Sequence, residues 1–309
     1  MTGTFDLGWW GVLLAVVAGA IRVSTPYLLV SLGETLTEKS GRVNLGLEGT
    51  LVFGAMSAFA TCYLTGSPWL GMLAAGVAGS ALGLLHAAIC NLPRVNDVAV
   101  GIALFIFGIG LAFFLGKPFI EPRAPMLPGL PLGNWSSNPA VRSAFEVSPM
   151  FFFGIVLAIV LEWSLKHTRW GLILRIAGES ADAARAIGLR INRIRTLATM
   201  AGGFLSGLGG GFLSLYYPGN WNEGLSSGQG LMAIALVIFA RWSPMRCFYA
   251  SLLFGGTAAI GPAVQTIGIT EGYYLFYAAP YVLTLGLLIY SSSPTRTLAG
   301  APAELSISR

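Results

Sequence analysis

The feature that most constrains this chain is a succession of long apolar segments along nearly its whole length. A helix needs roughly 20 mostly apolar residues to cross about 30 Å of hydrocarbon. The sequence holds about nine candidates, at about 8–31, 45–65, 69–91, 97–116, 149–166, 196–217, 228–240, 245–265 and 273–290. The seventh is short and indicates half of a broken helix. We therefore predict an all-α, polytopic membrane protein of about nine (8–10) transmembrane helices, some discontinuous, in a single domain over residues 1–309.

Composition excludes the soluble classes of protein. Only 10 % of the 309 residues are charged, whereas a soluble domain has about 25 % and needs them to cover its surface. A soluble enzyme, a disordered chain and a disulfide scaffold are therefore ruled out. The three cysteines, Cys62, Cys90 and Cys247, each lie in or beside an apolar run, and no Cys/His cluster with metal-ligand spacing appears. We expect no metal site.

Basic residues indicate which loops face the cytoplasm. Lys and Arg follow every odd-numbered segment, and seven of the eighteen lie between Lys166 and Arg195. The even-numbered connections carry only Lys117, Arg123 and Arg142. The positive-inside rule then places the N-terminus outside and the C-terminus in the cytoplasm, with a cytoplasmic loop at about 167–195 and a long external loop at about 117–148. Basic residues beside membrane spans do not indicate nucleic-acid binding.

Two glycine-rich segments interrupt this pattern, one in each half of the chain. SGRVNLGLEG (Ser40–Gly49) precedes the second apolar segment, and PGNWNEGLSSGQGLMAIAL (Pro218–Leu236) opens the seventh. Non-helical backbone survives at membrane depth only where protein buries it or where it lines a cavity. Discontinuous helices at corresponding places in two halves are typical of a transporter's binding site. The alternative is two ordinary loops rich in turn residues.

The sequence contains no recognisable nucleotide-binding or catalytic motif. The segment GETLTEKS (Gly33–Ser40) ends like a P-loop, but Glu38 stands where its second glycine must be. His86 and His167 have no metal or nucleophile partner at motif spacing. The chain should therefore not hydrolyse ATP itself, carries no cofactor of its own, and is predicted not to be an enzyme.

The segment GESADAARAIGLRINRIRTLA (Gly178–Ala198) lies in the basic loop. Ser180 can cap a short helix, Asp182 lies in the first turn, where the helix dipole favours a negative charge, and Gly188 can end the helix. Small alanine side chains keep this helix slim, so that another protein can approach it, and Ala184 is expected on the docking face. The alternative is a plain connecting helix.

Residues Asp182–Gly188 (DAARAIG) resemble the EAA-xxx-G loop of ABC-importer permeases, with Asp in place of Glu. Further matching stretches are TPYLLVSLGE (Thr25–Glu34), KSGRVNLGLEG (Lys39–Gly49), RVNDVAVGIAL (Arg94–Leu104) and GQGLMAIALVIFARWSP (Gly228–Pro244). They resemble the branched-chain amino-acid, ribose and nucleoside branch, and most of all its nucleoside and simple-sugar permeases. The chain departs from that pattern at Asp97, where Gln would be expected.

The resemblance implies one permease subunit of an ATP-driven importer in a bacterial or archaeal plasma (inner) membrane. A second, different permease would complete the pathway, an external substrate-binding protein would deliver the solute, and a cytoplasmic ABC ATPase would hold ATP and Mg. The coupling helix that contacts the ATPase would include Glu179, Asp182, Ala183, Ala184 and Gly188. Nucleosides, related nucleobases or simple sugars are the implied solutes. The alternative is a secondary transporter or channel that works alone.

Polar side chains inside or beside the apolar segments are candidates for the solute pathway, because ionisable groups in a membrane usually face a cavity. The candidates are Asn44, Glu48, Asn96, Asp97 and Arg22. Helix capping is the alternative for Glu48 and Asp97. Arg22 either extends to the membrane surface or pairs with an acid such as Glu34 or Glu48. The run Gly202–Phe212 repeats glycine at 203, 207 and 211, which predicts close helix packing.

Overall fold

The computed structural model describes residues 8–120, 122–265, 274–291 and 300–307. The long helices are α1 (Gly8–Lys39), α2 (Leu47–Thr65), α3 (Pro68–Cys90), α4 (Asp97–Gly116), α6 (Pro149–His167), α9 (Ile191–Leu215) and α11 (Pro244–Gln265). The shorter ones are η1 (Lys117–Phe119), α5 (Pro139–Ala144), α7 (Arg169–Glu179), α8 (Ala181–Ala186), α10 (Gln229–Phe239), α12 (Tyr274–Tyr277), α13 (Ala279–Ser291) and α14 (Glu304–Ile307). Two-residue strands β1 (Leu130–Pro131) and β2 (Glu146–Val147) pair antiparallel.

The all-α prediction is confirmed, and seven helices within the described residues are long and apolar enough to cross a membrane. The predicted seventh segment forms only the 11-residue α10, and the predicted ninth is divided between α12 and α13. A count of nine spans therefore stays a prediction. The predicted connection 266–272 and Arg296 lie outside the described residues.

Helix α1 is longer than expected. The first apolar segment was predicted to end near residue 31, because Glu34, Glu38 and Lys39 follow. The helix continues to Lys39, and both glutamates are buried inside the protein. A helix can bury acidic side chains when neighbouring groups donate hydrogen bonds to them. Hydropathy does not register such partners.

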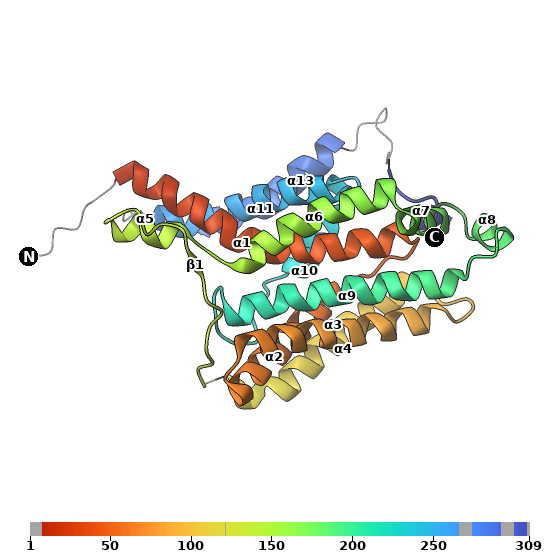
Figure 1. Cartoon of the computed structure of the whole chain (residues 1–309), viewed down its shortest axis with the longest axis horizontal. Helices are drawn as coiled ribbons and strands as arrows, with labels where there is room; N and C mark the ends of the chain where they lie inside the picture. Colours follow the sequence, from red (N-terminus) through yellow and green to blue (C-terminus); the bar gives the residue numbers. More distant parts are fainter. Residues whose placement is uncertain (1–7, 121, 266–273, 292–299, 308–309) are drawn as a thin grey trace, which may run out of the picture.

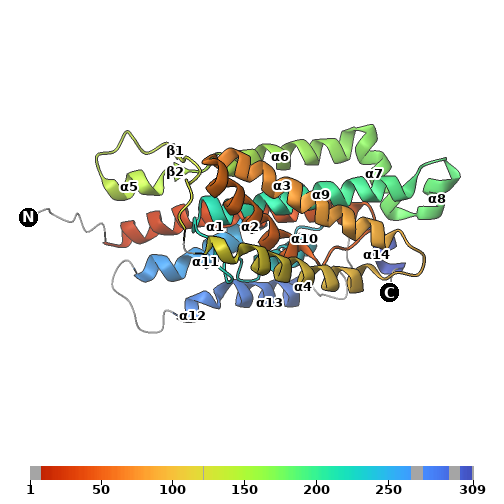
Figure 2. The same cartoon turned by 90° about the horizontal axis from the view of Figure 1, so that it is seen from below.

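The helices form an elongated bundle, most of them running along its length (Figure 1). Helix α9 is central and packs against α1, α2 and α3, while α11 packs against α1. Helix α5 lies at one end of the bundle, and α7, α8 and the C-terminal segment lie at the other; the view from below agrees (Figure 2). The two predicted loops, 117–148 and 167–195, are thus at opposite ends.

Close packing of the α9 glycines is confirmed. A Cβ built at Gly203 would lie 2.3 Å from the carbonyl oxygen of Gly79, and one at Gly207 would lie 2.1 Å from that of Ala75. Both distances are far below van der Waals contact. Helices α3 and α9 therefore approach so closely that only glycine fits at these positions.

Serine–proline pairs begin two of the long helices. The Ser67 hydroxyl accepts from the amide of Leu70 in α3, and the Ser148 hydroxyl accepts from that of Met150 in α6. Pro68 and Pro149 occupy the first helical position, where no intrahelical donor is needed. These caps fix where each helix begins, directly before its apolar run.

Candidate functional site

The two glycine-rich segments meet at Glu48, in the first turn of α2. Its carboxylate accepts hydrogen bonds from the Ser226 hydroxyl (2.5 Å) and from the amides of Gly228 (3.1 Å), Gly230 (2.6 Å) and Leu231 (3.3 Å). These amides belong to the start of α10, where backbone donors have no intrahelical partner. Only 3 % of Glu48 is exposed. One buried acid thus joins the first turns of two helices that lie 182 residues apart in sequence.

Asn44 shapes the loop that leads into α2. Its side-chain oxygen accepts from the amide of Gly46 at 2.9 Å, which forms a local turn. The backbone amide of Asn44 donates to the Glu34 carboxylate of α1 at 2.9 Å. Asn44 is buried, so this loop is tied to α1 below the protein surface.

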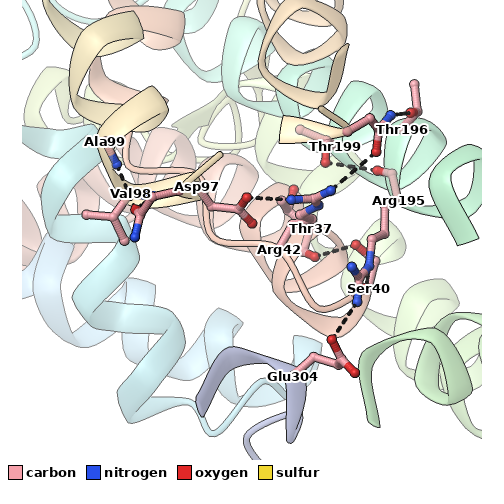
Figure 3. A network of polar contacts seen from close by, with 12 residues as sticks. Thr37, Ser40, Arg42, Asp97, Val98, Ala99, Arg195, Thr196, Thr199 and Glu304 are labelled. Carbon is pink, nitrogen blue, oxygen red and sulfur yellow. Dashed lines mark hydrogen bonds and ion pairs between the residues drawn. The ribbon is translucent and has the colours of Figure 1, made fainter. Parts of the chain in front are cut away.

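Asn96 and Asp97 begin α4. The Asn96 side chain accepts from the amides of Val98 (2.8 Å) and Ala99 (3.1 Å) and is a helix cap. Asp97 forms a largely buried ion pair with Arg42 at 2.5 Å, drawn in Figure 3. The loop before α2 and the start of α4 are therefore held together by opposite charges.

Arg22 lies apart from these residues. Its guanidinium donates to the carbonyl oxygen of Ser143, in α5, at 2.5 Å. The suggested pairing with Glu34 or Glu48 is wrong, because the Arg22 guanidinium binds α5, whereas Glu48 binds the start of α10 and Glu34 binds the loop before α2. The structure thus brings Asn44, Glu48 and the Arg42–Asp97 pair around α2 but leaves Arg22 near the α5 end.

Several buried polar groups escaped the sequence-based selection. The Gln229 side-chain oxygen, at the start of α10, is buried and has no hydrogen-bond partner among the residues that the structure describes, and the same is true of one carboxylate oxygen of Glu34. Glu38 accepts from the Trp242 indole nitrogen. A signal for Gln229 was present, since it follows Gly228 at the end of the glycine-rich segment. Trp221 is also buried, and its indole nitrogen donates to the Gly116 carbonyl at 2.9 Å.

The segment predicted to couple forms a short helix, α8, as expected. The Ser180 hydroxyl accepts from the Ala183 amide at 3.2 Å, and Gly188 follows with φ +81°, a left-handed conformation that suits glycine. The placement of Ala184 on the docking face is wrong. Ala184 is fully buried and packs with Ala181 and Ile191.

The exposed face of α8 carries other side chains. Asp182, Ala183, Ala186 and Ile187 are exposed, and Asp182 pairs with Arg185 at 2.7 Å. Glu179, the last residue of α7, is exposed as well. A small alanine beside an exposed isoleucine offers a partner an apolar contact at a slim helix.

An apolar pocket of about 170 Å³ lies between α1, α6, α7 and α9, lined by residues that include Leu36, Leu161, Trp170 and Leu197. None of the nominated polar residues lines it. Over the part of the chain that the structure describes, no group of three or more His, Cys, Asp or Glu side chains could hold a metal ion. The candidate functional site is therefore the polar cluster around α2 and α10.

Comparison with known proteins agrees with this architecture. The family model described as "Branched-chain amino acid transport system / permease component" matches residues 16–290. A putative glucose ABC transporter permease of Haloferax volcanii is 32 % identical over 254 residues, covering 81 % of this chain and 77 % of the relative.

Two further relatives are described as permeases for nucleosides. The nucleoside ABC transporter permease NupC of Lactococcus lactis is 31 % identical over 292 residues, covering 89 % of this chain and 92 % of the relative. The guanosine ABC transporter permease NupQ of Bacillus subtilis is 28 % identical over 299 residues, covering 89 % and 91 %. Together with the match over most of the chain, these relatives show that the protein belongs to the permease components of the branched-chain amino-acid transport type: it is a prokaryotic, multi-pass ABC-importer permease and not an enzyme.

Proposed function

We propose that this permease imports a nucleoside, a related nucleobase or a simple sugar. The observation that carries the proposal is that the protein itself already engages the acids nominated for the pathway. Glu48 accepts four hydrogen bonds from the segment that opens α10, and Asp97 is paired with Arg42. A zwitterionic amino acid needs counter-charges of both signs, whereas a neutral, hydroxyl-rich solute needs only hydrogen-bonding groups. The names of the nucleoside and glucose relatives support the same choice.

The solute pathway is proposed to run past Asn44, Glu48, Asn96 and Asp97, with Arg22 nearer the entrance. Glu48 and Asp97 would shape this pathway by holding α2, α4 and α10 in place. Gln229 is a stronger candidate for direct contact, because its buried amide oxygen has no protein partner among the described residues. A hydroxyl group of the solute could donate to that oxygen.

We propose a single permease domain over residues 1–309 with about nine spans, the N-terminus outside and the C-terminus in the cytoplasm. The broken helix α10 would supply the seventh span, and the pair α12 and α13 would supply the ninth. The positions of α5 and α8 at opposite ends of the bundle support this orientation (Figure 1), as does the concentration of positive charge around α7 and α8.

Membership in the family implies an ATPase and a substrate-binding protein as partners. We propose that α8, with Glu179, Asp182, Ala183 and Gly188 on or beside its exposed surface, docks on the cytoplasmic ATPase, which holds ATP and Mg. A second, different permease subunit would complete the pathway within the lipid bilayer. Movement of the ATPases would then reach the solute gate through α8 and the rigid helices behind it.

The test is uptake by the full importer, reconstituted in vesicles with its ATPase, second permease and binding protein. We expect ATP-dependent uptake of a labelled nucleoside or hexose and none of leucine; leucine uptake alone would refute the solute assignment. Uptake by this chain without the ATPase would favour the alternative of a transporter or channel that works alone.

Docking through α8 is tested in the same preparation. Ala183→Arg places bulk and charge on the exposed face of α8 and should abolish uptake and ATPase binding. Leu92→Arg adds the same side chain to the exposed loop between α3 and α4 and serves as the matched control. Equal uptake by both variants would remove α8 from the docking surface.

A further inference from the structure

The C-terminal segment, residues 300–307, lies at the end of the bundle where α1 ends and where α8 lies (Figure 1). Pro302 is buried, and Ala301 and Leu305 pack against the main apolar core. The Lys39 ammonium, at the end of α1, donates to the carbonyl oxygen of Gly300 at 3.0 Å. This segment is therefore a docked part of the fold.

Glu304 uses both of its carboxylate oxygens in this arrangement. One oxygen accepts from the backbone amide of Ala181, the first residue of α8, at 2.7 Å. The other accepts from the guanidinium of Arg195 in α9 at 3.1 Å. Both side chains are largely withdrawn from solvent, with 18 % of Glu304 and 11 % of Arg195 exposed. Hydrogen bonds to an ionised group are stronger than neutral ones.

Arg195 extends this contact to two further elements, and Figure 3 shows it beside Ser40 and Glu304. Its guanidinium donates to the carbonyl oxygen of Ser40, directly after α1, at 3.0 Å. It also donates to that of Ala177, in the last turn of α7, at 3.2 Å. The Glu304–Arg195 pair thus links α8 to α1, α7 and α9 at one point.

Helix α8 has little else to hold it. It is six residues long, and a helix of that length is marginal without tertiary support. Its apolar contact is a small cluster of Ala181, Ala184 and Ile191, against which the partly buried Ile176 and Leu189 pack. The residue before it, Ser180, is extended, with φ −156°, so the chain bends between α7 and α8. The orientation of α8 therefore depends on the bonds at its first residue.

We propose that Glu304 is a positioning residue for coupling: the C-terminal segment sets the orientation of α8, and so governs how efficiently movement of the ATPase is converted into solute transport. This inference rests on the proposed docking of α8 to the ATPase. Glu304 touches neither solute nor nucleotide; it acts through the backbone of α8 and through Arg195.

The test compares Glu304→Ala and Glu304→Gln in the complete reconstituted importer. Gln keeps an oxygen that can accept from Ala181 but loses the charge that binds Arg195, whereas Ala loses both contacts. Glu146→Gln neutralises an exposed acid in β2, at the opposite end of the bundle from α8, and is the control. Two quantities are measured: hydrogen exchange of the α8 amides, and the amount of solute imported per ATP hydrolysed.

We expect Glu304→Ala to speed hydrogen exchange of the α8 amides at least about tenfold, as the loss of a hydrogen bond to a charged group predicts. Solute imported per ATP should fall, because hydrolysis continues while α8 is misaligned. Glu304→Gln should lie between wild type and Glu304→Ala, and Glu146→Gln should match wild type.

Two results would overturn the proposal. One is wild-type exchange and wild-type import per ATP in both Glu304 variants. The other is a loss of uptake and of ATP hydrolysis that both match the loss of assembled complex. That result would make Glu304 a residue for folding alone. Ala183→Arg separates this failure from failure of the docking role, because only the latter leaves that variant fully active.

Discussion

Glu48 of α2 and Gly230 of α10 are joined by a hydrogen bond of 2.6 Å from the glycine amide to the buried carboxylate. A Cβ at Gly230 would also lie 2.6 Å from Cα of Glu48, so the two helix starts are in backbone contact. An acid at this place satisfies donors that the first turn of α10 cannot satisfy itself. A residue of the second apolar segment, Glu48, therefore caps the start of the broken seventh segment.

This junction predicts the effect of Glu48→Gln. An amide has one acceptor oxygen in place of two, and its NH2 group would face amides that also donate. We expect the variant to lose about 2 kcal/mol of stability and at least about tenfold in uptake. A thiol-reactive dye can follow unfolding, because Cys62, Cys90 and Cys247 are buried. Uptake near the wild-type rate would contradict both the pathway role and the junction.

The Arg42–Asp97 pair predicts a non-additive result. Asp97→Asn leaves the Arg42 charge without its counter-charge and with only the neutral Asn91 side chain as a partner, and the loss of one charge costs about 3–5 kcal/mol in buried pairs. The double variant Arg42→Gln/Asp97→Asn removes both charges and should recover much of that loss. Thermal unfolding of both proteins in detergent checks the order. A double variant no more stable than Asp97→Asn would show that the charges do not act as a pair.

Membrane orientation is checked by thiol labelling from one side. We expect Asn134→Cys, in the exposed loop near α5, to react with an impermeant reagent added outside intact cells. Arg190→Cys, in the exposed turn between α8 and α9, should react only after the membrane is opened. The buried native cysteines provide a low background. The reverse labelling pattern would invert the proposed topology.

Glycine packing is tested by a pair of Gly→Ala changes. At Gly207 the added methyl group would lie 2.1 Å from the Ala75 carbonyl oxygen, whereas at Gly110 nothing lies within 4 Å. We expect Gly207→Ala to destabilise the protein by about 2–3 kcal/mol through overpacking. Gly110→Ala should be neutral, and equal melting temperatures for both variants would argue against the close α3–α9 contact.

Hydropathy predicted the long helices well, because a membrane span is recognisable from a single continuous run of residues. It ended α1 too early, because Glu34 and Glu38 are buried through partners that come from other parts of the chain, the Asn44 amide and the Trp242 indole. The break between α12 and α13 lies directly before Ala279-Pro280, and proline is a helix-break signal that hydropathy does not register.

The candidate site was less accessible to sequence reasoning. The two glycine-rich segments could be matched by composition, but their meeting at Glu48 depends on a contact across 182 residues. The prediction that Ala184 lies on the exposed face of α8 was wrong. Ala183 and Ala184 have identical side chains, so the sequence pattern cannot tell which of the two is buried. Glu304 had no local motif at all, and only the folded chain places it beside Ala181.

The glycine contacts of α9 have a consequence for motion. Of the most apolar stretch of α9, 72 % is buried, against 22 % in α4 and in α6. Backbones that touch through glycine cannot slide without steric overlap, so α2, α3 and α9 are expected to move as one body. Alternating access would then require hinge-like displacement of the peripheral helices, and spin labels on α3 and α9 should keep a constant separation throughout the transport cycle.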